Sequence, residues 1–427
     1  MLDEREDRIL RLLNAVQGHS QLRQRPTERR LDRLIEHAIR TVPFYEARFR
    51  GSVPALEELP VVSRQDFVDD EMSFRSCTHG LRDVVETYTS GTTGLALRVV
   101  WDAASYYQYA FDIYREVFAR VPELSGTLRA GFPAVLILND NLTKSSQVLA
   151  NPSLDFAQVR RVILGHNSEE DADAWAIAAS EQAPLLYGRP RTLMRLAEIA
   201  EDLSIARTNP LRPCAVLSSG DNLYDSDRRV IETTFRARVY NAYVSQEGGF
   251  LTLQCPLTSA LHVLTDRAHV EVLSDFHSEP AAMGAGEIVV TNLGNWAMPF
   301  FRYRSGDRGV VTRGVCVCGH EGASFVQLDG RDTEYFVIAG ERVVATKLNP
   351  VFESLPIRHF QVRQTGPAAF RVRFVPEATA DKEIIERLLA ERIQERLGCV
   401  TLAMERTDQI SEAGQKVQRY LIEAGVT

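Results

Sequence analysis

Strands and helices alternate through the middle of this sequence, and this alternation limits the folds that the chain can adopt. Short runs of strand-forming residues predict strands at 131–138, 160–165, 184–188, 214–220 and 237–243. Amphipathic stretches between them predict helices, among them 190–203 and 225–235. Such alternation is typical of a parallel α/β sheet, so we expect a large N-terminal α/β domain. From about 268 to 312 the pattern changes to short strands and turns, which predicts a β-rich subdomain.

The stretch Tyr88–Gly94 reads YTSGTTG and predicts a phosphate-binding loop. Its glycines allow positive φ and close approach of a ligand, and its backbone N–H groups and hydroxyls form an anion site. It is not a Walker loop, because no Gly-Lys-Ser/Thr follows. Strand formers lead into and out of it, so we expect the tip of a β-hairpin. A flexible surface turn is the alternative interpretation.

Composition excludes several classes of protein. A length of 427 residues suits about two or three domains, and a net charge of −8 argues against a nucleic-acid binder or a polybasic membrane anchor. The first residues are charged and helical, unlike a secretory signal, and no apolar run is long enough to span a bilayer. Six cysteines in so long a chain predict a reducing cytoplasm.

A domain boundary is predicted near residue 330. Residues 1–330 would form the large domain, and residues 331–427 contain short strands, a long helix at 381–398 and a last strand. This predicts a small C-terminal α+β domain of ordinary size, joined to the large domain by a hinge.

Six blocks follow one another in a fixed order. They are YTSGTTG, SSGD at Ser218–Asp221, NAYVSQEGG at Asn241–Gly249, FRYRSGD at Phe301–Asp307, GRDTEYFVIAGERV at Gly330–Val343 and GQKVQR at Gly414–Arg419. Together they resemble the adenylate-forming superfamily of acyl-CoA synthetases, luciferases and peptide-synthetase adenylation domains. The segments IEHAIRTVPFYEARF, LPVVSRQDF and MPFFRYRSGDRG are similar, more narrowly, to the phenylacetate–CoA ligase-like branch.

This resemblance implies an ATP-dependent carboxylate ligase. A carboxylic acid, with an aromatic acid as the first expectation, would become an acyl-adenylate with release of pyrophosphate. The acyl group would then pass to a thiol, most simply that of coenzyme A. Two alternatives stay open: transfer to an amine or to a carrier protein supplied in trans, and a non-catalytic nucleotide-binding protein with a degenerate site. The resemblance leaves a homodimer as a possibility and implies no nucleic-acid or membrane partner.

The resemblance also implies roles for residues of the large domain. The phosphate-gripping loop would consist of Thr89, Ser90, Gly91, Thr92, Thr93 and Gly94, with Thr92 also counted as catalytic. Tyr243 would stack on the adenine, Gln246 would reach the α-phosphate, and Glu247 would bind Mg²⁺ and act in catalysis. Gly220 and Asp221 would complete that pocket. A buried core aromatic is the alternative for Tyr243.

Further implied roles lie at and beyond the domain boundary. Asp307 would accept both ribose hydroxyls, which suits the two oxygens of a carboxylate. Arg331 would reach ribose or phosphate from the hinge, and the hinge itself is assigned to Asp332 and Thr333 without a choice between them. Lys416 would be the catalytic lysine, which neutralises charge where the carboxylate meets the α-phosphate.

The sequence departs from the family pattern at several of these blocks. Ala96 replaces a common proline, Val244 replaces a glycine, and Gln246 replaces a hydroxyl residue. Asp221 stands where glutamate is frequent. The sequence therefore departs most from the family pattern in the predicted adenine and α-phosphate pocket.

Cysteine and histidine spacing predicts a separate metal site. Cys316 and Cys318 form a tight CxC turn, and Cys255 and His262 lie together upstream. Three thiolates and one imidazole would make a closed, structural zinc site. His320 is the rival for the histidine position, and the alternative is a buried cysteine beside an incidental turn.

Overall fold

The computed structural model describes most of the chain. It covers residues 27–78, 84–89, 97–124, 127, 135–140, 147–150, 159–164, 175–176, 178–180, 182–202, 210–274, 279–331, 335–377, 380–408, 410 and 419–423. In them, no helix is long and apolar enough to cross a membrane.

A mainly parallel sheet forms the centre of the described chain. Its strands lie in the order β4 (Gln147–Ala150), β5 (Val159–Leu164), β3 (Val135–Asp140), β6 (Leu185–Gly188), β7 (Ala215–Ser219) and β8 (Arg238–Ala242). All neighbours run parallel except β4, which pairs with β5 in the antiparallel direction. The predicted α/β organisation is therefore confirmed, and β4 is an edge strand that the sequence did not indicate.

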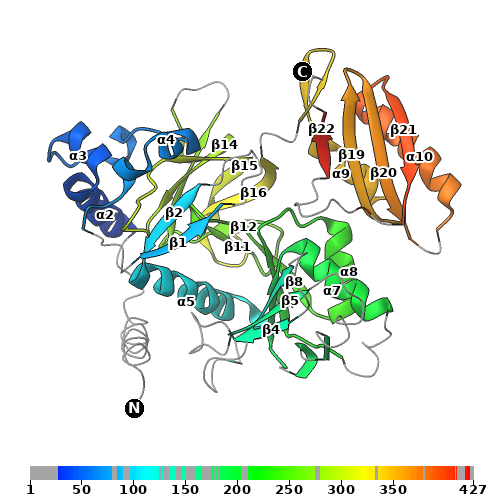
Figure 1. The fold of residues 1–427 in the computed structure, drawn as a ribbon, viewed down its shortest axis with the longest axis horizontal. Helices are drawn as coiled ribbons and strands as arrows, with labels where there is room; N and C mark the ends of the chain where they lie inside the picture. Colours follow the sequence, from blue (N-terminus) through cyan, green and yellow to red (C-terminus); the bar gives the residue numbers. More distant parts are fainter. Residues whose placement is uncertain are drawn as a thin grey trace.

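Helices cover both faces of this sheet. On β3, Leu136 and Leu138 pack toward α7 (Pro190–Asp202) and α8 (Asp225–Phe235). The alternate residues of β3 pack on the other face with α5 (Ala103–Arg120). Because both faces of the sheet are covered, alternate residues of β3 are all buried, and this strand reads as a nearly continuous apolar run. Figure 1 shows α5 on one side of the sheet and α7 with α8 on the other.

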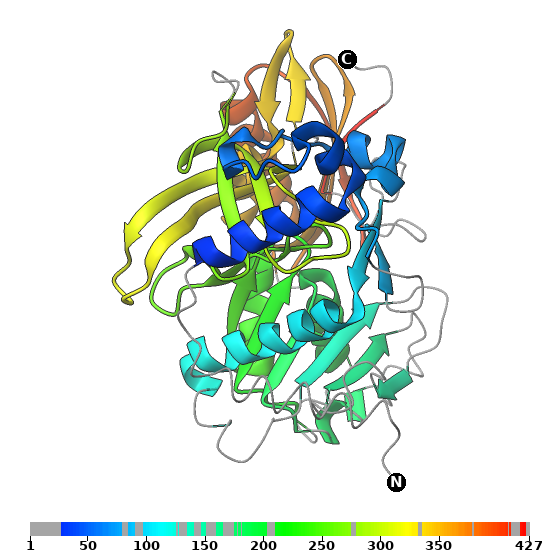
Figure 2. The ribbon, with the colours of Figure 1, turned by 90° about the vertical axis from the view of Figure 1, so that its left-hand side faces the viewer.

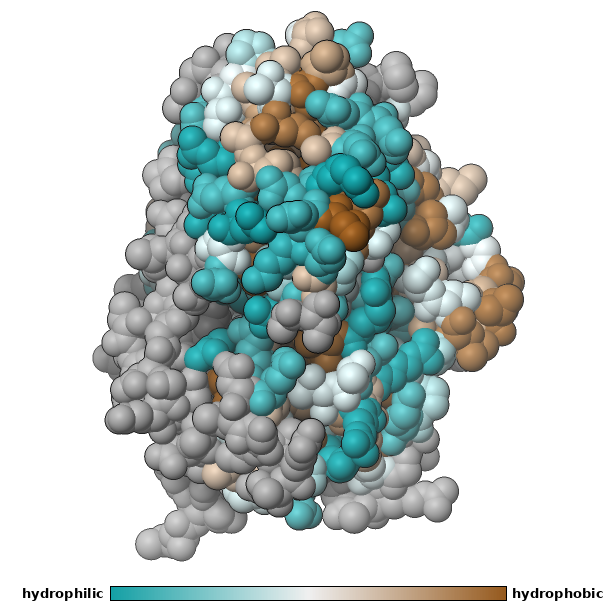
Figure 3. Space-filling model, turned by 90° about the vertical axis from the view of Figure 1, so that its right-hand side faces the viewer, coloured by the Kyte–Doolittle hydropathy of each residue, from teal (hydrophilic) through white to brown (hydrophobic). Residues whose placement is uncertain are grey.

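An antiparallel sheet confirms the predicted β-rich subdomain. Its order is β11 (Thr252–Gln254), β12 (Leu261–Val263), β16 (Glu321–Arg331), β15 (Tyr303–Val315), β14 (Gly284–Asn292) and β13 (Ala268–Leu273). The β15–β16 hairpin projects from the body of the molecule (Figure 2). Val315 and Val317 at its tip are 74% and 78% exposed. In Figure 3 the projection at the right-hand edge is coloured brown, which marks hydrophobic residues.

The N-terminal segment packs against the antiparallel sheet through aromatic residues. It contains α2 (Thr27–Thr41), α3 (Pro43–Phe49), η2 (Leu56–Glu58), α4 (Arg64–Asp69) and η3 (Glu71–Phe74). Phe67 of α4 stacks between Phe74 and Phe300, with ring centroids 4.1 and 4.5 Å away. Val62 forms a parallel bridge with Tyr303 of β15. These contacts place the start of α4 beside β15.

The residues after 334 form a sheet and a hydrophobic core of their own. The sheet order is β21 (Thr401–Arg406), β20 (Ala369–Pro376), β19 (Ile357–Gly366) and β22 (Tyr420–Ile422), with α10 (Lys382–Leu397) packed on it. The hairpin β17 (Tyr335–Ile338) and β18 (Glu341–Val344), η8 (Ala345–Leu348) and α9 (Asn349–Glu353) precede it. We call residues 335–423 the C-terminal module. Other short elements are η4 (Pro122–Leu124), β9 (Val244–Ser245) and β10 (Gly249–Phe250).

Candidate active site

The predicted phosphate loop lies between the two strands of a hairpin. Strands β1 (Val84–Tyr88) and β2 (Arg98–Asp102) pair in antiparallel register, with Tyr88 opposite Arg98. The hairpin prediction is therefore confirmed. The loop residues Ser90, Gly91, Thr92, Thr93 and Gly94 lie outside the described residues, so their contact with phosphate stays a prediction.

Thr89 closes the base of this loop. Its backbone N–H donates to the carbonyl of Leu97 at 3.0 Å, and the Leu97 N–H donates to Thr89 Oγ1 at 2.9 Å. Nη2 of Arg64 also donates to Thr89 Oγ1, at 3.0 Å. The Thr89 oxygen thus accepts two hydrogen bonds within the protein, while its hydroxyl hydrogen can still be donated. This contact of Arg64 with a predicted site residue was not indicated by the sequence, although Arg64 lies in the LPVVSRQDF segment.

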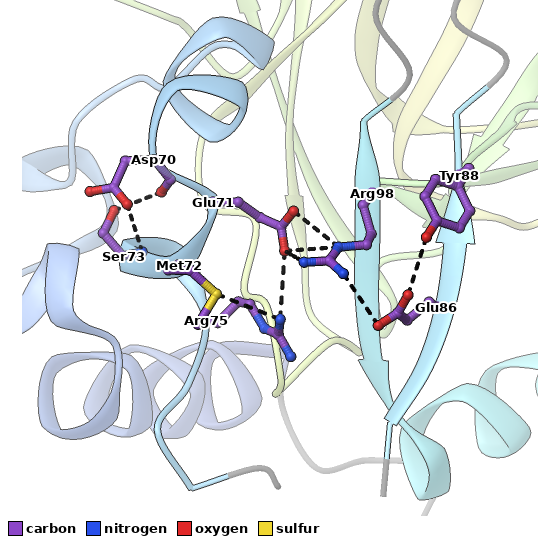
Figure 4. A network of polar contacts seen from close by, with 8 residues as sticks. All are labelled: Asp70, Glu71, Met72, Ser73, Arg75, Glu86, Tyr88 and Arg98. Carbon is purple, nitrogen blue, oxygen red and sulfur yellow. Dashed lines mark hydrogen bonds and ion pairs between the residues drawn. The ribbon is translucent and has the colours of Figure 1, made fainter. Parts of the chain in front are cut away.

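An ionic network anchors the hairpin to η3 (Figure 4). Arg98 donates to Glu71 through Nε at 3.1 Å and through Nη2 at 2.8 Å. Arg98 also lies 3.6 Å from Glu86, which accepts a hydrogen bond from Tyr88. Such bidentate arginine–carboxylate contacts fix geometry, so both arms of the hairpin are held against the N-terminal segment.

Tyr243 and Asp307 meet between the two sheets. Tyr243 follows β8, Asp307 lies on β15, and the Tyr243 hydroxyl donates to Asp307 Oδ2 at 2.6 Å. Burial, followed by the Asp307 charge, raises the pKa of Tyr243 well above its usual value, so the phenol stays a donor. The ring is 8% exposed and meets Phe325 edge to face at 5.9 Å. Tyr243 is thus buried with its hydroxyl on the proposed ribose acceptor, and its stacking on the adenine stays a prediction.

Glu247 is held by a second tyrosine on β15. The hydroxyl of Tyr303 donates to Glu247 Oε1 at 2.9 Å, and Asn292 Nδ2 donates to the Glu247 carbonyl at 2.8 Å. The second carboxylate oxygen of Glu247 is a hard ligand of the kind that Mg²⁺ prefers. Sequence reasoning missed Tyr303, although it lies in the FRYRSGD block. Gln246 is exposed beside Glu247.

Other predicted residues lie at the carboxyl edge of the parallel sheet or outside the described chain. Gly220 directly follows β7 with φ +85°, a conformation that favours glycine, and Asp221 comes next. Ligands of open α/β sheets bind outside this edge. Arg331 pairs with Asp307 in the β15–β16 register. Asp332, Thr333 and Lys416 lie outside the described residues.

The four predicted metal ligands lie together. The candidate ligand atoms of Cys255, His262, Cys316 and Cys318 lie within 4.8 Å of one another. Sγ of Cys255 is 3.8 Å from Sγ of Cys316, and Nε2 of His262 is 3.2 Å from Sγ of Cys318. With Zn–S bonds of about 2.3 Å, two sulfurs of a tetrahedron lie about 3.8 Å apart. The donor set and spacing therefore fit zinc.

The surroundings of the cluster distinguish the two histidines. Nδ1 of His262 lies 2.8 Å from Ser324 Oγ, a contact that orients the ring and leaves Nε2 toward the thiols. His320 stacks on His262 with centroids 4.1 Å apart and is not part of the cluster. The geometry therefore favours His262. The cluster joins the β11–β12 loop to the end of the β15–β16 hairpin.

Comparison with known sequences gives one partial match. No family model matches the chain. A phenylacetate–coenzyme A ligase of Thermus thermophilus is 29% identical over 161 residues, which cover 36% of this chain. The matched segment spans about a third of that relative's length, 33%.

Comparison with solved structures covers nearly the whole chain. A 2-hydroxyisobutyryl-CoA ligase in a postadenylation state, with a hydroxyisobutyryl-AMP, superimposes with a TM-score of 0.74 at 18% identity, over 93% of this chain and 89% of that one. The same ligase gives 0.60 in an open conformation and 0.59 in its thioesterification state. An anthranilate CoA ligase with anthranoyl-AMP gives 0.53 at 11% identity, over 79% and 66%. The chain therefore has the fold of these adenylate-forming ligases, and part of it is similar in sequence to a phenylacetate–coenzyme A ligase.

Proposed function

We propose that this chain activates a carboxylic acid with ATP and transfers the acyl group to the thiol of coenzyme A. The observation that carries this proposal is the pair of tyrosine–carboxylate contacts between the two sheets. Asp307 and Glu247, predicted to bind ribose and Mg²⁺, come from different blocks and are both held by tyrosine hydroxyls at the edge where this fold binds ligands.

Each group has a defined part in the proposed first step. In-line attack of the substrate carboxylate at the α-phosphorus needs positioning and charge neutralisation more than covalent help. Asp307 would hold the ribose, the Thr89–Gly94 loop would grip the β- and γ-phosphates, and Arg331 would reach ribose or phosphate. Gly220, Asp221, Tyr243 and Gln246 would line the rest of the nucleotide pocket. Mg²⁺ would supply positive charge when bound by Glu247, and Lys416 would stabilise charge in the transition state.

The C-terminal module would then move so that the acceptor can enter. The TM-scores with one ligase fall from 0.74 in its postadenylation state to 0.59 in its thioesterification state at similar coverage. A different orientation of the C-terminal module relative to the rest of the chain would account for such a fall. We therefore assign the arrangement described here to the adenylation half of the cycle, with the hinge at Asp332 and Thr333.

A screen of carboxylic acids for pyrophosphate release, with and without coenzyme A, tests the proposed activity. We expect release that depends on a particular acid, with aromatic acids tested first, and an acyl thioester product only when coenzyme A is present. An amide product, or acylation of an added carrier protein, would move the acceptor to the alternatives. If none of the acids in the panel supports pyrophosphate release, the site is not that of a carboxylate ligase.

We propose that Cys255, His262, Cys316 and Cys318 bind a structural zinc ion. All four positions would be protein ligands, so none stays open for catalysis. The ion would fix the β11–β12 loop to the β15–β16 hairpin, next to the strand that carries Asp307. The cysteines within the described residues are free thiols, which suits the reducing cytoplasm to which we assign the protein.

The purified protein is expected to contain close to one zinc per chain. Cys316→Ser should lower the midpoint of thermal unfolding and the zinc content more than it changes the rate of pyrophosphate release, because the ion holds a hairpin. Cys399→Ser is the matched control, since Cys399 is an exposed cysteine outside the cluster. Fully folded protein that contains no zinc would contradict this assignment.

A further inference from the structure

An arginine of the C-terminal module forms a buried ion pair with the large domain. Nη2 of Arg419 donates to Asp227 Oδ1 at 2.8 Å and to Oδ2 at 2.7 Å. The two side chains are only 14% and 6% exposed, so water screens them little. Asp227 lies in the first turn of α8, which covers the parallel sheet, and Arg419 directly precedes β22. The pair therefore joins two parts of the chain that have separate cores.

Aromatic rings from both parts enclose the same guanidinium. The guanidinium carbon of Arg419 lies 3.6 Å from the ring centroid of Tyr224, just before α8, and 4.6 Å from that of Phe360 on β19. The backbone carbonyl of Arg419 accepts a 2.7 Å hydrogen bond from Val362 N–H, which fixes the arginine to its own sheet. One nitrogen of the guanidinium thus contacts both carboxylate oxygens while its plane lies over two aromatic rings, and such stacking of a planar cation is a contact that arginine provides and lysine does not.

The pair lies close in sequence to the predicted catalytic lysine. Lys416 precedes Arg419 by three residues, and three residues span at most about 11 Å. Any position of the module that keeps Arg419 on Asp227 therefore keeps the backbone of Lys416 within that distance of Arg419. A rotation of the module away from α8 would instead separate the guanidinium from both Asp227 and Tyr224.

We propose that Arg419 is a positioning residue, whose ion pair with Asp227 holds the C-terminal module in the orientation in which adenylation occurs. The pair opens before acyl transfer, because both partners cannot stay together when the module moves. This inference rests on the proposed function, and it adds a latch between the domains to the residues that contact the nucleotide. Arg419 acts through the placement of Lys416 and contacts no reacting atom.

Separate measurement of the two half-reactions tests the latch. Asp227→Asn keeps the side-chain volume and removes the charge, and Arg419→Gln breaks the pair from the other side. We expect each variant to slow acid-dependent pyrophosphate release at least tenfold. Transfer from a chemically made acyl-adenylate to coenzyme A should be unchanged or faster. Arg419→Lys should recover part of the adenylation rate, since it keeps the charge but loses the stacking of the planar guanidinium on Tyr224 and Phe360.

Arg373→Gln is the matched control, because it breaks a 3.0 Å ion pair with Glu405 within the C-terminal module. It should change neither half-reaction. Equal losses in both half-reactions of Asp227→Asn, or no loss in either, would overturn the positioning role.

A second readout does not depend on activity and separates this inference from the proposed function. Amide hydrogen exchange should rise in β19 and β22 in Asp227→Asn and stay at the wild-type level in Arg373→Gln. If no acid supports pyrophosphate release by the wild type, the proposed function fails. Unchanged exchange in Asp227→Asn would overturn the latch itself, whatever the activity.

Discussion

Lys416→Ala is expected to slow adenylate formation by on the order of a hundredfold or more, because it removes a charge needed while pyrophosphate leaves. Transfer of the acyl group from a chemically made acyl-adenylate should hardly change, since the lysine would be away from the site in that step. The measurement is the single-turnover rate of each half-reaction. Folding, followed by thermal unfolding, should be unaffected.

Lys382→Ala provides the control for the loss of a lysine from the same module. Lys382 is exposed at the start of α10, away from the GQKVQR block, and both half-reactions should keep wild-type rates in that variant. An equal loss in both half-reactions of Lys416→Ala would mean that the residue supports structure or general binding. No loss in either would mean that the C-terminal block has been wrongly matched to the family.

Asp307→Ala should weaken ATP binding by about 10- to 100-fold, because hydrogen bonds to a charged acceptor contribute roughly 1.5–3 kcal/mol and 1.4 kcal/mol is tenfold in affinity. It should also lower the free energy of unfolding by about 1–3 kcal/mol, since the buried Tyr243 hydroxyl loses its acceptor. Calorimetric titration with ATP and chemical denaturation measure the two effects.

Tyr243→Phe separates these two effects. It removes the same hydrogen bond, but keeps the aromatic ring and leaves the Asp307 carboxylate for the ribose. ATP should therefore bind Tyr243→Phe nearly as tightly as the wild type, while Asp307→Ala binds it weakly. If the affinity for ATP is unchanged in Asp307→Ala, Asp307 only stabilises the fold and does not bind the ribose.

Local signals predicted the elements of the large domain well. The apolar runs that became β3, β6 and β7 are buried on both faces, and α7 and α8 lie in the ranges that their side-chain patterns indicate. β4 was missed because it is a short edge strand, for which neither alternation nor a long apolar run is required. The short strands β11 and β12 were missed for a similar reason, since they depend on pairing with β16, which is distant in sequence.

The candidate site was predicted residue by residue only where a block resembled the family. Spacing placed Cys255 and His262 with Cys316 and Cys318, but only the three-dimensional structure, in which Nε2 of His262 lies 3.2 Å from Cys318 Sγ, favours His262 over His320. The partners of the site residues were not predicted. Arg64, Tyr303 and Asp227 reach Thr89, Glu247 and Arg419 across 25 to 192 residues of sequence, and such contacts leave no local pattern.

Acid-dependent exchange of labelled pyrophosphate into ATP is the most direct test of the central claim, that the chain forms an acyl-adenylate. The account predicts exchange that requires a carboxylic acid, does not require coenzyme A, and falls by on the order of a hundredfold in Lys416→Ala. Exchange reports the reversible formation of the adenylate and is independent of the acceptor. ATP that binds without exchange in the presence of any acid of the panel, or that is cleaved to ADP and phosphate, would contradict it.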